Sequence, residues 1–403
     1  MTARPTLVVF LGGLGGSHVE EIVGAARWAA SLDAIETALS GEAFAGAVLV
    51  TDDAALAADV PGVTVDLDRG DFHFGRRLAQ VLRRHAIASA VYMGGGSVPL
   101  FSAADFAAVA AAVAAGRGVT NNAYSSDLVG FPLSPVAQTC PEPGGSRSRR
   151  GPSPEGTPVS PVAQGPSPER VLQAIETVDR DNALSRALSE RAGLSIEALP
   201  RTCVTQMDID APGDLAVLSL TGGGGCRLQA YLGSLELDVS AYRRVLPLFT
   251  DTRAQIVVAG RVGSHAWQYL ERETACRVRL FAEERGMEAE GRVDEGTARS
   301  LLGFYLEEAG VARFFETLAQ LGDAAFIDTR VLLAHKRIEA SREDRFLSDL
   351  GRWREIGDPW LREFTQAAGE APVPVLLGGH SLMSGGLMAL NEHAWQLRDE
   401  GKL

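Results

Sequence analysis

The stretch TLVVFLGGLGGSHVEEIVGAARWAASLDAIETAL, residues 6–39, decides the fold class. Its first part, Thr6–Leu11, is a short apolar run typical of a buried strand, and a glycine-rich segment follows at 12–17. From Val19 to Leu39, apolar and small residues recur with helical spacing. The stretch therefore predicts a strand, a glycine loop and a helix in succession.

The same alternation continues through the first half of the chain. Three more apolar runs predict strands, at 47–50, 63–66 and 90–93, and helical periodicity is found at 74–85 and 102–115. Repeated alternation predicts an α/β domain, Rossmann-like, with a mostly parallel sheet and helices on both faces. Because ligands of such sheets bind beyond the carboxyl ends of the strands, we expect the glycine-rich loops at 12–17 and 94–99 at the ligand edge.

The second half has a similar pattern and predicts a second α/β domain. Strands are predicted at 254–259, 276–281, 324–328 and 373–377, and helices at 294–321. With 403 residues, of which 46% are hydrophobic and 22% charged, the chain is long enough for two cores. We expect a first domain at 1–244 and a second at 245–403.

One segment interrupts the alternation. Residues 139–169 are dense in Pro, Gly, Ser and Arg, and the sequence GPSPE occurs there twice, at 151–155 and 165–169. A segment of this composition buries too little apolar surface to offset the entropy of ordering it. We therefore predict a disordered insertion in a loop of the first domain.

The composition excludes several classes of partner. A net charge of −13 argues against a nucleic-acid surface, which would be basic. No apolar stretch approaches the ~20 residues that span a bilayer, and the first residues lack the basic start of a signal peptide, so we expect a cytoplasmic protein without a membrane partner. The four cysteines are scattered, which predicts free thiols. Small molecules are the expected partners, and a homo-oligomer is left open.

An acidic motif ends the first-domain pattern. It reads Asp208-Ile-Asp-Ala-Pro-Gly-Asp-Leu215 and follows a run at 202–206 that is predicted to be a strand. Asp208 and Asp210 are spaced to reach one point, and Mg²⁺ prefers carboxylate oxygens as ligands. Alternatively, Asp210 fits the N-cap of a helix that has Pro212 in its first turn. The motif predicts a metal ligand, a helix cap, or both in succession.

Four features of the first half occur together: the glycine loop after the first strand, Gly94-Gly-Gly-Ser-Val-Pro-Leu100, Asn182-Ala-Leu184 and the acidic motif. Together they resemble the nucleotidyltransferase superfamily with the glycosyltransferase-A-type fold, nearest the molybdenum-cofactor guanylyltransferases and the phospholactate or phosphoenolpyruvate guanylyltransferases. The resemblance covers residues 5–220. It does not extend to the second half, to which no family is assigned.

The resemblance implies an enzyme that binds an NTP with Mg²⁺ (or Mn²⁺) and transfers the NMP to a small phosphorylated or hydroxyl acceptor, releasing pyrophosphate. Free backbone N–H groups at a strand-to-helix turn attract phosphate, although glycines also serve tight turns. The expected nucleotide-binding residues are Gly12, Gly13, Gly15, Gly16, Ser17, Gly95, Gly96 and Ser97, and the expected metal ligands include Asp208 and Asp210.

Two positions depart from the pattern of that family. The glycine loop has no Lys or Arg before Arg27, and Ser97 stands where the family has a metal-binding aspartate. Asp127, which follows the predicted strand at 118–122, is a candidate replacement ligand, so Asp127 and Asp210 are the predicted catalytic pair. Arg76 is the candidate replacement for the loop cation, the alternative being a solvated helix start.

In the second half, Leu376–Gly386 again predicts a strand, a glycine loop and a helix. The candidate anion-binding residues there are Gly379, His380, Ser381 and Ser384. We expect this domain to recognise the acceptor or to act on a neighbouring step. Two alternatives stay open: a non-catalytic nucleotide-binding or scaffold protein, and an enzyme whose chemistry lies in the second domain around His380.

Overall fold

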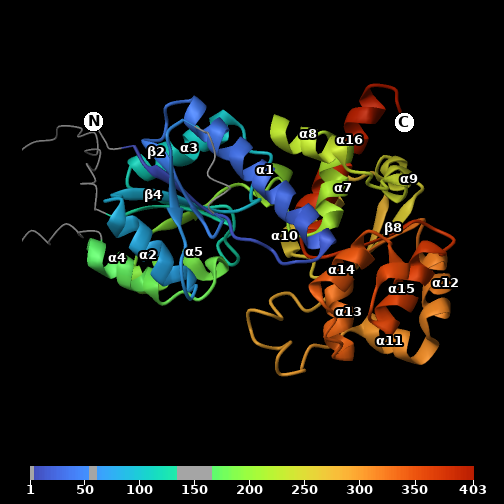
Figure 1. Cartoon of the computed structure of the whole chain (residues 1–403). Helices are drawn as coiled ribbons and strands as arrows, with labels where there is room; N and C mark the ends of the chain where they lie inside the picture. Colours follow the sequence, from blue (N-terminus) through green and yellow to red (C-terminus); the bar gives the residue numbers. More distant parts are fainter. Residues whose placement is uncertain (1–3, 54–60, 134–165) are drawn as a thin grey trace, which may run out of the picture.

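A seven-stranded sheet forms the first half of the computed structural model, which describes residues 4–53, 61–133 and 166–403 (Figure 1). Its order is β3-β2-β1-β4-β6-β5-β7, and β6 runs antiparallel to its neighbours β4 and β5 while the other pairs are parallel. The predicted α/β architecture with a mostly parallel sheet is therefore confirmed. The strands are β1 (Thr6–Phe10), β2 (Gly46–Thr51), β3 (Val63–Leu67), β4 (Ser89–Gly94), β5 (Gly118–Thr120), β6 (Leu128–Pro132) and β7 (Ile196–Ala198).

Helices cover both faces of this sheet. Because successive side chains of a strand point to opposite faces, Leu7 and Val9 of β1 enter one core while Val8 and Phe10 enter the other. The buried apolar run that decides the fold thus supplies two cores at once. The first core is covered by α1 (His18–Ser40) and α3 (Ala103–Ala114), and the second by α2 (Phe74–Arg84), α4 (Pro168–Glu176), α5 (Leu184–Ala187) and a π-helical turn at Leu188–Ala192.

The second half is built on a four-stranded parallel sheet with the order β11-β10-β8-β9. Its strands are β8 (Gln255–Gly260), β9 (Arg277–Ala282), β10 (Ala324–Asp328) and β11 (Val375–Gly378). The face that carries Val257 packs on α11 (Leu301–Ala309), α12 (Val311–Leu321) and α15 (Pro359–Gly369). The remaining helices are α10 (Ser264–Glu273), α13 (Thr329–Lys336), α14 (Arg342–Asp349) and α16 (Leu387–Asp399).

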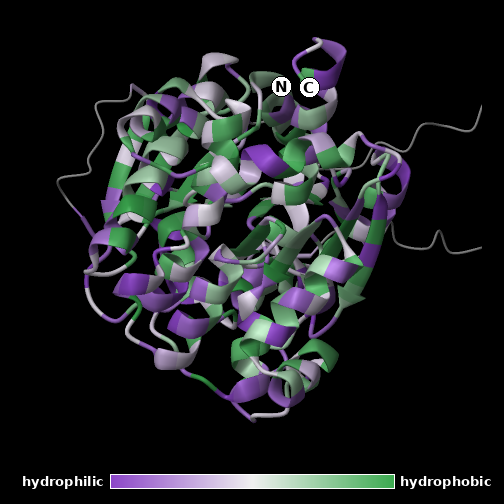
Figure 2. Ribbon diagram, turned by 90° about the vertical axis from the view of Figure 1, so that its right-hand side faces the viewer, coloured by the Kyte–Doolittle hydropathy of each residue, from purple (hydrophilic) through white to green (hydrophobic). Residues whose placement is uncertain are grey.

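The two sheets share a core. One buried apolar cluster contains Val23 of α1, Leu215 of α7, Ile256 of β8 and Leu387 of α16, and Figure 2 shows hydrophobic residues continuous through the interior. In Figure 1, α1 and α7 lie side by side between the first sheet and the helices of the second half. The predicted domain boundary after residue 244 falls inside α9. The joining helices are α6 (Cys203–Gln206), α7 (Pro212–Thr221), α8 (Cys226–Ser234) and α9 (Ser240–Phe249).

The prediction of a strand at 202–206 is wrong, because Thr202 caps the helical turn α6, which the following residues form. The Thr205 hydroxyl accepts the Thr202 N–H at 3.0 Å and donates to Pro200 O at 2.7 Å. These hydrogen bonds satisfy the Thr202 N–H and the Pro200 carbonyl, which a strand would pair with the backbone of an adjacent strand. The short strand β7, which no pattern predicted, takes the edge position instead.

Two further boundaries differ from prediction. Helix begins only at Leu301, not at 294, because Ser300 accepts the Gly303 N–H and caps α11 there. Residues 139–165 of the predicted insertion lie outside the described residues, but its end is ordered into α4, where Ser167 caps the helix and Pro168 fits its first turn.

Two predictions from composition can be followed in the described ranges. Cys203, Cys226 and Cys276 are free thiols, and Cys140 lies outside those ranges. None of the helices found in them combines the length and the apolar character needed to cross a bilayer.

Candidate functional site

The loop after β4 lies at the carboxyl edge of the first sheet and is packed tightly. Gly96 has a φ of +83°, and its N–H donates to Ser31 Oγ at 3.0 Å. Arg27 Nε donates to Gly95 O at 2.8 Å. A Cβ added at Gly95 would lie 2.4 Å from Leu11 Cδ1, so glycine is required by the close approach of β1. This loop joins β4, β1 and α1.

The acidic motif docks onto the same loop. Ser97 and Asp208 form an isolated antiparallel bridge, and the Ile209 N–H donates to Gly96 O at 3.2 Å. The bridge holds the segment between α6 and α7 beside the end of β4. Asp208 therefore lies at the edge where the sequence predicts a ligand.

Four carboxylates meet at this edge, and we call them the acidic cluster: Asp127, Asp181, Asp208 and Asp210. Asp127 precedes β6, and Asp181 begins a single 3₁₀ turn at Asp181–Ala183, where Tyr92 Oη donates to its Oδ2 at 3.0 Å. The charge of Asp210 acts on each of the other three. The structure thus brings together the predicted residues Asp127, Asp208 and Asp210 and adds Asp181.

The acidic cluster is short of positive charge. Burial, and then repulsion by Asp210 and Asp181, raise the pKa of Asp127 to about 7 despite a hydrogen bond from Asn121. Burial and the charges of Asp210 and Asp127 raise the pKa of Asp208 well above its ordinary value. The pKa of Asp181 is raised too, chiefly by burial. Carboxylates in this state gain stability when a cation binds among them.

Arg27 of α1 contributes positive charge to the cluster. Its guanidinium acts to lower the pKa of Asp127, Asp181 and Asp208, but the pKa of each of the three is still raised. The hydrogen bond to Gly95 O fixes this side chain at the loop. One arginine therefore does not neutralise the cluster.

The N-cap of α7 is Ala211, not Asp210, and the side chain of Asp214, the third residue of the helix, reaches back to the N-cap. Asp214 Oδ2 accepts the N–H groups of Asp210 at 2.9 Å and Ala211 at 2.8 Å, and Oδ1 accepts the Ser381 hydroxyl at 2.6 Å. Pro212 is in the first turn, as predicted. The interpretation of Asp210 as the N-cap is wrong, because Ala211 holds that position and the Asp214 carboxylate accepts the N–H groups of both residues. The exposed side chain of Asp210 has no part in the cap.

The glycine loop after β1 is engaged by acidic side chains of the chain itself. Ser17 and Glu20 form a capping box, in which Ser17 Oγ accepts the Glu20 N–H at 3.4 Å and the Glu20 carboxylate accepts the Ser17 N–H at 3.2 Å. The Gly13 N–H donates to Asp52 Oδ1 at 3.3 Å. A phosphate at Ser17 or Gly13 would replace these carboxylates, whereas the exposed Gly12, Gly15 and Gly16 have no such bond.

A cation from the second half stands at this loop. Arg342, the first residue of α14, hydrogen-bonds Leu14 O and lies 3.7 Å from the Glu20 carboxylate. The sequence shows no basic residue in the loop, and the tertiary structure supplies one from more than three hundred residues away. No local pattern could have identified Arg342, because its role depends on packing between the two halves.

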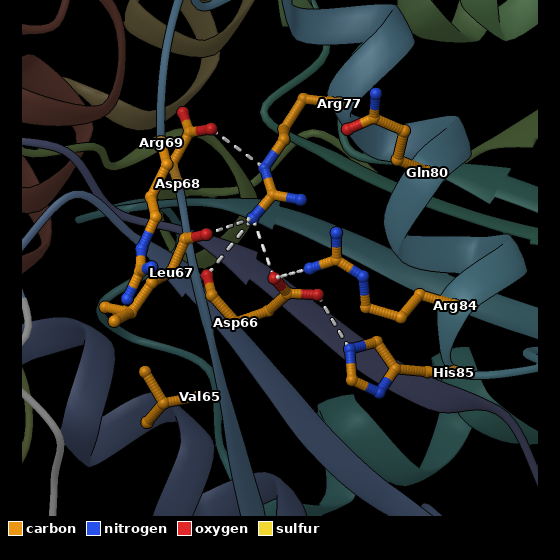
Figure 3. Close-up of a pocket in the computed structure, with 9 residues that line it drawn as sticks. All are labelled: Val65, Asp66, Leu67, Asp68, Arg69, Arg77, Gln80, Arg84 and His85. Atoms are coloured by element: carbon orange, nitrogen blue, oxygen red, sulfur yellow. Dashed lines mark hydrogen bonds and ion pairs between the residues drawn. The ribbon is translucent and has the colours of Figure 1, made fainter.

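The predicted phosphate ligand Arg76 is exposed, and its neighbour Arg77 is held in a separate network. We call this the Asp66 network: Asp66 contacts Arg77 at 2.9 Å, Arg84 at 2.5 Å and His85 at 2.8 Å, and Arg77 also lies 3.0 Å from Asp68 (Figure 3). Burial favours a higher pKa for Asp66, but hydrogen bonds from Arg77 and His85 bring the pKa below its ordinary value. These residues line a pocket of about 470 Å³. Their charges are matched within the network, which indicates a structural role.

The candidate residues of the second half lie beside the acidic cluster. His380 Nδ1 is 3.2 Å from Arg261 O, and since a carbonyl only accepts, Nδ1 carries the proton. Burial lowers the pKa of His380, while the charge of Asp210 acts in the opposite direction. The neutral ring leaves Nε2 as an acceptor near the cluster. Two candidate sites that lie far apart in the sequence thus form one region.

The other predicted anion ligands of the second half are already engaged. The Ser381 hydroxyl donates to Asp214, and the Ser384 hydroxyl donates to His380 O at 3.2 Å. Gly379 is buried, and a Cβ there would lie 3.6 Å from the Arg330 guanidinium. The structure therefore gives Ser381 a positioning role at the start of α7.

The donor set of the acidic cluster suits a hard cation such as Mg²⁺, because it consists of carboxylate oxygens whose charges repel. In the parts of the chain that the structure describes, no three His, Cys, Asp or Glu side chains already stand in a metal-coordinating arrangement. Coordination by Asp127, Asp208 and Asp210 would therefore require a rearrangement of these residues when the ion binds. The residues fit the ion in chemistry.

Comparison of the sequence with protein-family models and with curated proteins gives no match. Three residues of the candidate site were not predicted as site residues: Asp181, Arg27 and Arg342. Asp181 directly precedes the Asn182-Ala-Leu184 motif and could have been found by that position. The role of Arg27 could not be predicted, because it depends on the packing of α1 against the loop after β4.

Proposed function

We propose that this protein is a Mg²⁺-dependent nucleotidyltransferase that transfers NMP from an NTP to a small phosphorylated or hydroxyl acceptor and releases pyrophosphate. The observation that carries the proposal is the acidic cluster at the carboxyl edge of a mostly parallel sheet, beside two glycine loops. Partly buried carboxylates that repel one another reduce stability, and such arrangements persist where a ligand uses them.

In this proposal, the residues of the cluster and those around it bind different parts of the metal–nucleotide complex. Asp127, Asp208 and Asp210 would hold Mg²⁺ (or Mn²⁺), which when bound neutralises the triphosphate and the charge that grows on the leaving pyrophosphate. Arg27 and Arg342 lie on the side of the glycine loops and would orient phosphate oxygens. Transfer between phosphoryl groups requires mainly positioning and charge neutralisation, so no further nucleophile is needed.

Metal-dependent nucleotide binding separates this proposal from a scaffold. We would measure the thermal stability of the full chain with ATP, CTP, GTP or UTP, each with and without Mg²⁺. A ligand at ~100 times its dissociation constant adds ~2.7 kcal/mol to the free energy of unfolding. We expect one NTP to stabilise the protein only with Mg²⁺, and Asp210→Asn to abolish that effect.

The matched control is Asp71→Asn, which removes an exposed carboxylate of the same half outside the cluster. This variant should keep the shift of the wild type. If no NTP stabilises the wild type, or if Asp210→Asn responds as the wild type does, the transferase assignment is wrong. The site around His380 would then be the next place to look for chemistry.

A further inference from the structure

Arg201 and Arg285 are two arginines of the central region that have no carboxylate partner in the described parts of the chain. Neither forms an ion pair there. The contact of the Arg201 guanidinium that the structure shows is a long one, 3.5 Å from Nη2 to Asn122 Oδ1. Arg201 is half-buried and Arg285 is exposed.

Both arginines lie at the start of α10. The Arg201 carbonyl accepts a hydrogen bond of 2.6 Å from Nε2 of His265, in the first turn of this helix. The Arg285 guanidinium carbon lies 3.7 Å from the Cβ position of Gly263, which precedes the helix. Arg201 comes from the loop before α6 and Arg285 from the loop after β9. One residue from each half of the molecule therefore lies at the start of α10, Arg201 through its backbone and Arg285 through its side chain, while the Arg201 side chain extends toward Asn122.

Other arginines at the edge of the second sheet are committed to carboxylates. Arg261 binds Asp328 through Nε at 2.6 Å and Nη2 at 3.2 Å, and Arg330 binds Asp349 through both of its terminal nitrogens. Their donors hold the loops of the sheet edge together. This leaves Arg201 and Arg285 with donors for a ligand.

The surroundings of the two arginines favour an anion. Burial, and next the charge of Arg285, lower the pKa of Arg201, so the pair repels as the acidic cluster does with opposite sign. Arg201, but not Arg285, lines a pocket of about 250 Å³. Two glutamates line this pocket as well, but Glu273 lies 3.6 Å from Arg272, and Glu392 accepts hydrogen bonds from the Tyr269 hydroxyl and the Cys203 thiol.

The order of the strands places Arg201 on the opposite side of the acidic cluster from the glycine loop. The loop follows β1, whereas Asn122 and Arg201 follow β5 and β7 at the far end of the sheet. Asp127 connects the two sides, because Asn121, next to Asn122, donates to its carboxylate at 3.2 Å. A ligand held by Arg201 and Arg285 would face the cluster from the side away from the nucleotide.

We propose that Arg201 and Arg285 form a clamp for a phosphate group, and that this phosphate belongs to the acceptor. The second part rests on the proposed function. In the transfer step an ionised oxygen of the acceptor attacks the α-phosphorus, a new P–O bond forms, and the bond to the β-phosphate oxygen breaks, with its electron pair leaving on pyrophosphate. Because an ionised phosphate oxygen carries no proton, this step does not require a general base to activate the acceptor.

Binding of inorganic phosphate tests the clamp without any nucleotide or metal. We would titrate phosphate into the full chain and follow the broadening of its ³¹P resonance for the wild type, Arg285→Gln and Arg201→Gln. Loss of a charge-assisted hydrogen-bond donor should weaken binding about tenfold in each variant. The matched control is Arg277→Gln, an exposed arginine at the other end of the same strand, which should bind phosphate as the wild type does.

A second arm identifies the source of the phosphate. The affinity for the NTP with Mg²⁺ should be the same in Arg285→Gln as in the wild type, because the nucleotide lies on the β1 side. If that affinity falls in parallel with phosphate binding, the clamp holds the nucleotide and the assignment to the acceptor is wrong. If phosphate binds all variants equally, there is no clamp. The phosphate titration can be read even if no NTP binds, so failure of the clamp is distinguishable from failure of the transferase proposal.

Discussion

Two groups of acidic residues in the first half stand in opposite electrostatic states. In the Asp66 network, a buried carboxylate has three basic partners, and its pKa lies below the ordinary value. In the acidic cluster, four carboxylates share Arg27 and repel one another, and the pKa of Asp127 rises to about 7. Both groups lie in loops or at strand ends of the same sheet, so burial alone does not explain the difference.

The comparison shows how charge balance distinguishes acidic residues that have basic partners from acidic residues that lack them. The pocket at the Asp66 network is lined by residues whose charges already satisfy one another. The acidic cluster has no comparable partner among the residues that the structure describes, and it lies where ligands of parallel sheets bind. A search for cavities would have identified the Asp66 network as the candidate site, whereas the balance of charges identifies the acidic cluster.

The largest expected effect is on turnover. Asp210→Asn should reduce the rate of pyrophosphate release on the order of 1000-fold, because a metal ion contributes several kcal/mol to charge stabilisation and each 1.36 kcal/mol is tenfold in rate. The measurement is pyrophosphate formed from the NTP identified by thermal shift. Wild-type turnover in this variant would show that the exposed carboxylate is not part of the site.

Substitutions in the Asp66 network should lower the free energy of unfolding rather than change turnover. Asp66→Asn leaves Arg77 buried without its main partner, and removal of one member of a buried ion pair costs about 3 kcal/mol of unfolding free energy. Denaturant unfolding measures this. Asp68→Asn is the matched control and should cost less, because Asp68 is more exposed and contacts Arg77 only. Equal effects would show that the network is not centred on Asp66.

The pH dependence of this stabilisation has a definite sign. The pKa of Asp66 is lowered in the folded state, so its contribution is fully present above the unfolded value of about 3.9 and is lost as the pH falls through the folded pKa. The difference in unfolding free energy between wild type and Asp66→Asn should therefore be constant near neutral pH and shrink below about pH 4. A difference that grows in acid would contradict the lowered pKa.

The smallest expected effect is an increase in stability, opposite in sign to the effect of Asp66→Asn. Asp127→Asn removes one of the repelling charges, so without added metal it should raise the free energy of unfolding by about 1 kcal/mol. With Mg²⁺ and the NTP, the variant should gain less than the wild type. Denaturant unfolding in the presence of a chelator provides the first measurement. A loss of stability without metal would place Asp127 in the same class as Asp66.

Much of the fold could be predicted from local pattern. The helices at 18–40, 74–84 and 103–114 and the strands that alternate with them follow from periodicity. The errors fall where side chains override propensity: Thr205 turns a β-branched run into α6, and Asp214 takes the capping role expected of Asp210. In each case a hydrogen bond to a nearby backbone N–H decides the conformation.

The sequence by itself determined the α/β class, the two glycine loops and the candidates Asp127, Asp208 and Asp210, because these depend on spacing along one segment. Only the tertiary structure placed Asp181 with them, brought Arg342 to the glycine loop and set Arg201 against Arg285 at α10. Such contacts join residues from different elements and from both halves of the molecule. Their electrostatic meaning depends on which charges are neighbours in space, and that is fixed only when the two sheets pack on a shared core.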